Sequence, residues 1–494
     1  MRILMLAPGF SIHSTRPLNR LLEQGHEVIY VDGENPYPGG KERFLFIPYV
    51  NADDSFAVPM LREIRADLHP DLVHVHRVDR RAYQCMKAGF KPLILTAWGS
   101  DINNYFNPAG ERQYLLEQEL MAETLRNADL FIHDTPDIER KGALIAGRPI
   151  PSERFLLGVN TRLFKPGDEH EVTALREKLR ITTDATVFVS IRAMSPVYNH
   201  HQILLAFWYA RQSFDKDAVL VFRKYNNRDY LDYEASLLAL IERLGLGPAV
   251  RWMEPCSFDQ MPAVYALADY ILNYPIRDAF PVTFLEAAAC GRPVITNRLP
   301  AYEHTFVERF FEMVEPGNVR ALAQPLVRAV NGAKKKAEIK AKQQTLAEAR
   351  NAMLTHYDES KAADQLVEIY RRLITPNPHP SGGRKPLAEA RWQRYLEKGL
   401  SGLDLSTVTT DLEMYQLGSV FKQLGHEDKA ETCFRHVINA SAKTKYLAGA
   451  WFHLGDIYYR QGRMADARTM VTRCLALSPE HRAAIAIRTA IEGQ

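Results

Sequence analysis

The stretch Asp278-Ala-Phe-Pro-Val-Thr-Phe-Leu-Glu286-Ala-Ala-Ala-Cys-Gly-Arg-Pro-Val-Ile295 follows an apolar run at Tyr270–Leu272 that predicts a β-strand. It places one carboxylate on a loop and a second one, eight positions later, in the first turns of a short helix that ends at Gly291. Because a helix N-terminus at the carboxyl end of a strand attracts anions, the stretch predicts an α/β unit with a ligand-binding edge. On spacing alone, a solvated acidic pair beside a buried helix explains it equally well.

Short apolar runs alternate with helix-period segments on both sides of this stretch. The expected strands are Ile3–Leu6, Val28–Val31, Leu72–Val75, Leu93–Thr96, Leu130–Ile132, Val187–Ile191, Val219–Phe222, Val250–Trp252, Tyr270–Leu272 and Val294–Thr296. The alternation pauses once, around Gly158–Gly167, where Pro166 and Gly167 interrupt it. Strand–helix alternation predicts parallel sheets with helices on both faces, so we expect two doubly wound, Rossmann-like domains facing each other.

The remainder of the chain is predicted to be helical. Thr375–Pro386 contains four prolines and two glycines, which indicates a linker. Beyond it, positions 414, 417, 418, 421, 425, 430 and 434 recur 37 residues later with similar residue types. This pattern resembles the tetratricopeptide repeat. The expected organisation is therefore 1–163, 164–374 with a final helix, the linker 375–386, and an all-α repeat region at 387–494, where helices around 387–400 and 481–491 cap the repeats.

Composition excludes several classes of protein. The 494 residues are 46 % apolar and 24 % charged, with a net charge of +3, which is ordinary for a soluble protein and not typical of a nucleic-acid binder. The five cysteines are dispersed and form no CxxC pair, which argues against disulfides or a zinc site. We find no signal peptide, membrane span or metal-ligand spacing, so we expect a cytoplasmic protein with at most peripheral membrane contact.

The stretch at 278–295 resembles the donor-site signature of family 4 glycosyltransferases, which have the GT-B fold. In that signature two glutamates are separated by seven residues and followed by a small-residue helix. The resemblance spans residues 1 to about 374 and is stronger in the second half. Further matching stretches are Leu21–Val28, Pro70–His76, Gly99–Asp101, Gly158–Pro166, Leu244–Trp252 and Met261–Asp269.

The resemblance implies roles for individual residues. Glu286 matches the glutamate that binds the ribose hydroxyls, and Asp278 matches the one that faces the donor sugar. Arg192, after the strand Val187–Ile191, matches an arginine that pairs with the diphosphate, whose oxygens suit its bidentate fork. Backbone N–H groups that follow the first acidic residue usually hold sugar hydroxyls, and the candidates here are Phe280, Val282 and Thr283.

Three departures from the family pattern concern the sugar-facing half of the site. The first glutamate is Asp278, which is one methylene shorter, and the usual glycine nearby is Pro281, which has no N–H. The lysine expected about five residues after Arg192 is missing. Arg223 or Lys224, at a strand end, could supply that charge, although an ordinary solvated pair explains them as well.

Candidates in the first half of the chain are weaker. Relatives have a histidine near Trp98, so Asp101 is the best polar group left there, and we include it with Asp278 and Arg192 among the catalytic candidates. Acceptor-side candidates are Gly9, His13, His76 and Trp98, with His133-Asp134 as a comparable alternative. His74 and His76 alternate on their strand, and we expect them to point to opposite faces, so that at most one of them, His76, reaches the site. A satisfied loop or core histidine is the competing explanation for both His13 and His76.

The function expected from the resemblance is transfer of a sugar from a nucleotide-diphosphate sugar to an acceptor hydroxyl with retention of configuration. No cofactor or metal is expected. The acceptor is a saccharide, a lipid-linked molecule or a protein, and bacterial surface glycan or glycoprotein assembly is the setting by analogy. The alternatives are a non-catalytic GT-B adaptor, which would use residues 387–494 for partner binding or self-association, and a GT-B nucleotide-sugar epimerase or a phosphorylase. Five lysines within Lys334–Lys342 indicate a solvated helix face or contact with an anionic membrane.

Overall fold

The structure, a computed structural model, describes residues 1–7, 12–32, 44–48, 54–106, 112–224, 231–332, 336–374, 386–401, 403–408, 410–440 and 446–493. The chain forms two compact units. One consists of Met1–Thr96, Leu115–Leu130 and Leu373–Gln494, and the other of Ala97–Tyr114 and Phe131–Arg372. Gly9 and most of the expected linker lie outside the described residues.

The first sheet has seven parallel strands in the order β3-β2-β1-β4-β5-β6-β7. Its strands are β1 (Arg2–Leu6), β2 (Glu27–Asp32), β3 (Leu45–Pro48), β4 (Leu72–His76), β5 (Leu93–Thr96), β6 (Leu130–His133) and β7 (Ser152–Arg154). The helices between them are α1 (Ile12–Glu23), α2 (Asp54–Leu68), α3 (Arg80–Lys87), α4 (Ser100–Tyr105), α5 (Arg112–Asn127) and α6 (Pro136–Ala146). The central strands are buried along their whole length, as parallel strands covered on both faces must be.

The second sheet has six parallel strands in the order β10-β9-β8-β11-β12-β13. Its strands are β8 (Thr186–Ser190), β9 (Ala218–Arg223), β10 (Val250–Met253), β11 (Tyr270–Asn273), β12 (Val294–Asn297) and β13 (Glu312–Val314). The accompanying helices are α7 (Glu169–Lys178), α8 (His200–Arg211), α9 (Leu231–Arg243), α10 (Met261–Leu267), α11 (Val282–Ala289), α12 (Phe306–Phe310), α13 (Val319–Asn331), α14 (Lys336–His356) and α15 (Glu359–Leu373). Two apolar clusters cover the two faces of this sheet.

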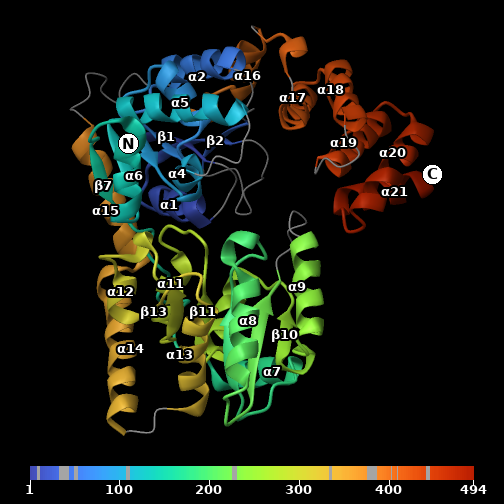
Figure 1. Cartoon of the computed structure of the whole chain (residues 1–494). Coiled ribbons are helices and arrows are strands. Elements are labelled where there is room, and N and C mark those ends of the chain that lie inside the picture. Colours follow the sequence, from blue (N-terminus) through green and yellow to red (C-terminus); the bar gives the residue numbers. More distant parts are fainter. Residues whose placement is uncertain are drawn as a thin grey trace. The chain divides into compact units, whose positions relative to one another are not determined.

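The described residues of the tail form helices joined by turns. Its helices are α16 (Trp392–Leu400), α17 (Asp411–Gln423), α18 (Glu427–Ala440), α19 (Leu447–Arg460), α20 (Met464–Leu477) and α21 (Arg482–Glu492) (Figure 1). Helices α17 with α18 and α19 with α20 pack as pairs, and small residues let them approach closely: a Cβ on Gly418 would meet the Phe434 ring at 2.8 Å. Two parallel α/β sheets followed by a helical-repeat region confirm the predicted fold class. Among the described residues, no helix combines the length and apolar character needed to span a bilayer.

Helix α16 does not behave as a simple cap of the repeats, because it packs against α2. Gly399 faces Phe56 so closely that a Cβ there would lie 2.7 Å from the ring. The Tyr395 hydroxyl donates to the Asp67 carboxylate at 2.6 Å, and Arg394 pairs with Glu63. The first tail helix is therefore part of the layer that covers the first sheet.

Candidate functional site

The carboxyl ends of β8, β9, β11 and β12 meet at one edge of the second sheet because the strands are parallel. Arg192 follows β8, Asp278 follows β11, and Tyr302 follows β12. The segment Tyr274–Pro281, which we call the donor loop, connects β11 to α11. Chain topology alone therefore brings these side chains to one edge of the sheet.

Asp278 is held by two donors from neighbouring strands. Arg192 Nη2 lies 3.2 Å from Asp278 Oδ1, and both side chains are only 12 % exposed. The Tyr302 hydroxyl donates to Asp278 Oδ2 at 3.0 Å and accepts a hydrogen bond from Asn273 Nδ2 at 3.1 Å. The Arg192 guanidinium also lies over the Tyr198 ring, 4.1 Å from its centroid. The result is a buried, rigidly positioned ion pair at the donor loop.

The charges of this pair are set by its surroundings. Burial acts to lower the pKa of Arg192, but Asp278, Tyr198 and Tyr302 outweigh it and raise that pKa above its ordinary value. Burial and the Asp278 carboxylate raise the pKa of Tyr302 well above its usual range, so the phenol stays protonated and keeps donating. Arg192 thus remains a cation that could bind a phosphate oxygen.

Glu286 occupies the second turn of α11 and is 4 % exposed. The Tyr265 hydroxyl of α10 donates to Glu286 Oε2 at 2.7 Å and fixes the orientation of the carboxylate. A buried carboxylate held on a helix suits hydrogen bonds from a pair of neighbouring hydroxyls. Tyr265 was not among the residues singled out from the sequence.

The N-terminus of α11 points its first N–H groups toward the donor loop. Pro281 is the N-cap residue, and it offers no side-chain acceptor to the N–H groups of Val282 and Thr283. The Thr283 hydroxyl is buried and has no hydrogen-bond partner among the described residues. An anionic or hydroxyl-bearing ligand could satisfy these groups.

Phe280 and the segment around Asp134 belong to the same compact unit. Phe280 N–H donates to Asp134 Oδ2 at 2.9 Å. Burial raises the pKa of Asp134 to about 7, and the nearby Asp278 and Asp101 carboxylates act in the same direction. Asp134 therefore occupies the N–H group that the family resemblance assigns to the donor sugar.

The structure gives Asp101 and Trp98 a local role. The Trp98 backbone N–H donates to Asp101 Oδ1 at 3.1 Å, which fixes the turn that begins α4. In the same segment, Asn103 Nδ2 donates to the Asp278 backbone carbonyl at 3.0 Å. Asn103 was not predicted as a site residue, because no motif in the surrounding sequence indicates a role for its side chain.

Arg223 and Lys224 have partners away from the ion pair. Lys224 Nζ lies 3.7 Å from Glu234 and 3.4 Å from Glu254, and Arg223 Nη2 donates to the Cys256 carbonyl at 3.1 Å. These contacts tie β9 to its neighbouring segments. A role in phosphate binding would require Lys224 to exchange these carboxylates for the ligand.

The histidines of β4 correct one expectation. His74 and His76 do not point to opposite faces: their ring centroids lie 4.3 Å apart, and both side chains are buried. Residues two apart on a strand share a face, so the expectation was physically wrong. Burial lowers the pKa of His74 to about 3 and that of His76 well below its ordinary value, so both are neutral. His13 lies on α1 and is half-buried.

No group of three or more His, Cys, Asp or Glu side chains in the described ranges is arranged to hold a metal ion. Among the described residues, the site combines the Arg192 cation, the Asp278 and Glu286 carboxylates, three tyrosines that contact these groups, and the N-terminus of α11.

Family models match most of the chain. The model "Glycosyl transferases group 1" matches residues 171–345, and "Glycosyl transferase 4-like" matches residues 2–135. Two tetratricopeptide-repeat models match residues 414–444 and 448–481. The matches place the Arg192–Asp278 pair and Glu286 inside the group 1 region.

Similar curated proteins include two D-inositol 3-phosphate glycosyltransferases. The one from Corynebacterium urealyticum is 23 % identical over 299 residues, which cover 58 % of this chain and 67 % of that protein. The one from Salinispora arenicola is 27 % identical over 248 residues, covering 47 % and 54 %. The chain thus spans between half and two thirds of the length of these relatives.

Solved structures with the same fold include sucrose-phosphate synthase from Thermosynechococcus elongatus, with a TM-score of 0.61 and 15 % identity over 76 % of this chain and 99 % of that one. Anabaena HepE in complex with UDP has a TM-score of 0.60 and 17 % identity over 76 % and 100 %. At these identities the likeness establishes the fold.

Proposed function

We propose that the chain transfers a sugar from a nucleotide-diphosphate sugar to an acceptor hydroxyl. It belongs to the group 1 glycosyltransferases, a family of retaining enzymes with the GT-B fold, and it carries C-terminal tetratricopeptide repeats. The observation that carries the proposal is the buried Arg192–Asp278 pair beside the N-terminus of α11, which bears Glu286. We take UDP as the first nucleotide to test, since a relative of the same fold was solved with UDP.

In this proposal each group has one role. Glu286, oriented by Tyr265, accepts hydrogen bonds from the ribose hydroxyls. Arg192 and the first N–H groups of α11 stabilise the negative charge that develops on the leaving diphosphate. Asp278, held by Tyr302, faces the sugar and accepts from one of its hydroxyls. The acceptor hydroxyl attacks from the face that the diphosphate leaves, so no protein nucleophile takes part.

Nucleotide binding tests the proposal directly. We expect UDP or another nucleoside diphosphate to raise the melting temperature of the full chain, because a ligand that binds only the folded state stabilises it. Glu286→Ala should abolish the shift, whereas Glu177→Ala, on the exposed side of α7, should keep it. If no nucleoside diphosphate raises the melting temperature, the result would contradict the proposal and favour a non-catalytic adaptor.

We further propose surface glycan or glycoprotein assembly in the cytoplasm as the setting, with the repeats recruiting a protein acceptor or partner. The support is the repeat region itself, because helical repeats form extended binding surfaces. Two truncations separate recruitment from stability. A chain that ends at 408 keeps α16 on α2 and should remain folded but lose partner binding, whereas one that ends at 386 should also lose stability. Equal partner binding by the chain that ends at 408 would refute a recruiting role.

A further inference from the structure

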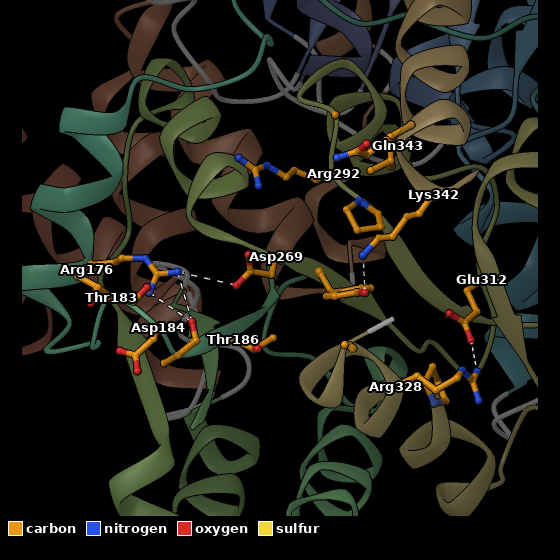
Figure 2. A pocket seen from close by; sticks show the side chains of 18 residues that line it. Arg176, Thr183, Asp184, Thr186, Asp269, Arg292, Glu312, Arg328, Lys342 and Gln343 are labelled. Carbon is orange, nitrogen blue, oxygen red and sulfur yellow. Dashed lines mark hydrogen bonds and ion pairs between the residues drawn. The ribbon is translucent and has the colours of Figure 1, made fainter. Parts of the chain in front are cut away.

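A pocket lies at the amino-terminal edge of the six-stranded sheet, opposite the edge that carries the donor loop (Figure 2). Its volume is about 690 Å³, and it is lined by the residues that precede or begin β8, β11, β12 and β13, together with α7, α13 and α14. We call it the amino-edge pocket. Since the donor loop follows the carboxyl end of β11, the two sites lie at opposite ends of the same strands.

The pocket is lined by more cationic than acidic side chains. The cationic ones are Arg176, Arg292, Arg328 and Lys342, and the acidic ones are Asp184, Asp269 and Glu312. Arg176 lies 3.8 Å from Asp269, and Arg328 pairs with Glu312. Figure 2 shows Asp184, which is exposed, on the Arg176 side of the pocket. Arg292 and Lys342 thus have no carboxylate in an ion pair among the described residues.

Arg292 has a buried nitrogen that lacks a hydrogen-bond acceptor in the described part of the chain. Its Nε is buried and has no hydrogen-bond partner among the described residues. Burial lowers the pKa of Arg292, which means that the surroundings disfavour its charge, although the Asp269 carboxylate partly offsets this effect. The two terminal nitrogens of Arg292 are not among the enclosed atoms without a partner, so they are the atoms through which an anion in the pocket would contact this side chain.

Lys342 supplies a second positive charge at the rim of the pocket. Its ammonium contacts the Tyr270 hydroxyl and lies 3.9 Å from the centroid of the same ring. In the view of Figure 2, Arg292 lies between Arg176 and Lys342. Lys342 is also the last lysine of the basic run at 334–342, so part of that run belongs to a pocket and not merely to a solvated helix face.

The amino-edge pocket is linked to the proposed donor site by one short helix. Helix α11 begins beside the donor loop, and Arg292 follows its C-terminal end by three residues. Helix α11 packs against α14, which carries Lys342. A ligand that bridges Arg292 and Lys342 would therefore hold α11 against α14.

We propose that the amino-edge pocket binds a phosphate-bearing anion through Arg292 and Lys342, at a site separate from the donor site. Guanidinium and ammonium groups together match the oxygens of a phosphate. The phosphate belongs either to a soluble molecule or to the headgroup of an anionic lipid. Both sources share this chemistry.

Isothermal titration of the full chain with inorganic pyrophosphate tests the site, with sodium chloride at equal ionic strength as the control. We expect Arg292→Gln and Lys342→Met each to weaken binding about tenfold or more, since each removes a charged hydrogen bond. Lys340→Met, on the exposed surface of the same helix, should leave the affinity unchanged. The melting temperature of Arg292→Gln should match the wild type, because no hydrogen bond of Arg292 to the described residues is lost.

Flotation with vesicles of phosphatidylcholine, with or without phosphatidic acid, distinguishes the two sources. Binding to phosphatidic acid vesicles that falls in Arg292→Gln and Lys342→Met identifies a lipid headgroup, and binding of pyrophosphate alone identifies a soluble anion. The proposal is overturned if neither probe binds, or if binding is the same in the Arg292→Gln/Lys342→Met double variant. It is also overturned if Arg192→Met, in the donor site, removes all pyrophosphate binding.

Discussion

Replacing Arg192 with methionine should leave the Asp278 carboxylate next to Tyr302 without its cation, in surroundings where both partners are only 12 % exposed. At 3.2 Å and an effective dielectric constant of about 20, two unit charges attract by about 5 kcal/mol. Desolvation cancels much of this attraction, but removing one partner of a buried pair still costs about 3–5 kcal/mol because the other charge remains. We expect Arg192→Met to lower the free energy of unfolding by about 3 kcal/mol.

A double-mutant cycle separates the pair from the individual side chains. Asp278→Asn keeps an oxygen that accepts from Tyr302, and it should cost about 2–3 kcal/mol because Arg192 then lacks its carboxylate. The double variant should cost about 2 kcal/mol less than the sum of the two single ones, since neither charge is left unpaired. Urea denaturation of the full chain, with melting temperature as a second readout, measures all four proteins.

The exposed pair Arg371–Glu368 is a matched control for this cycle. Its nitrogen–oxygen distance is 3.6 Å, and its side chains are 62 % and 61 % exposed. Its coupling should stay below about 0.5 kcal/mol, as is usual for surface pairs. A coupling free energy below about 0.5 kcal/mol for Arg192 and Asp278 would refute the argument that these two side chains form a stabilising buried ion pair.

Two further predictions concern stability. The pKa of Asp134 is raised to about 7 from its ordinary 3.8, so its favourable contribution is complete below pH 4 and is lost as the pH rises through 7. Asp134→Asn should therefore become more stable than the wild type as the pH rises from 4 to 8, by at most about 4 kcal/mol. A difference between the two melting temperatures that stays constant across this pH range would contradict the raised pKa of Asp134. Gly399→Ala should destabilise the chain by about 1–2 kcal/mol, because the new Cβ meets Phe56 at 2.7 Å and overpacking outweighs the gain in helix propensity. The control Gly247→Ala has open space, and an equal melting temperature for both variants would show that α16 does not depend on this contact.

The strands that the sequence predicted are those with continuous apolar runs, and all of them are present in the sheets. The three that it missed, β3, β7 and β13, are the outer strands of their sheets or short polar segments. Strands β7 and β13 are three residues long and carry polar residues, so their local signal is weak, whereas β3 is apolar and was overlooked in the sequence. Backbone pairing with an adjacent strand, which no local pattern encodes, defines these elements.

The arrangement around Asp278 was only partly foreseeable. The sequence selected Arg192 and Asp278, and the structure joins them in one ion pair. Tyr198 and Tyr302, which support that pair, were missed because tyrosines near strand ends carry no distinctive spacing. The rule that parallel strands end at one edge of a sheet would have placed Tyr302 there, since it follows β12 by five residues.

The sequence by itself determined the two parallel α/β regions, the helical repeats and the stretch that carries Asp278 and Glu286, because periodicity and motif spacing are local properties of the chain. Only the tertiary structure decided which partners each charge has. In the structure, Arg192 pairs with Asp278, and Lys224 pairs with two glutamates. Helix α16 packs against α2, and Arg292 lines a pocket at the amino-terminal edge of the second sheet. Ion pairing and burial depend on residues far apart in sequence, and packing alone brings those residues together.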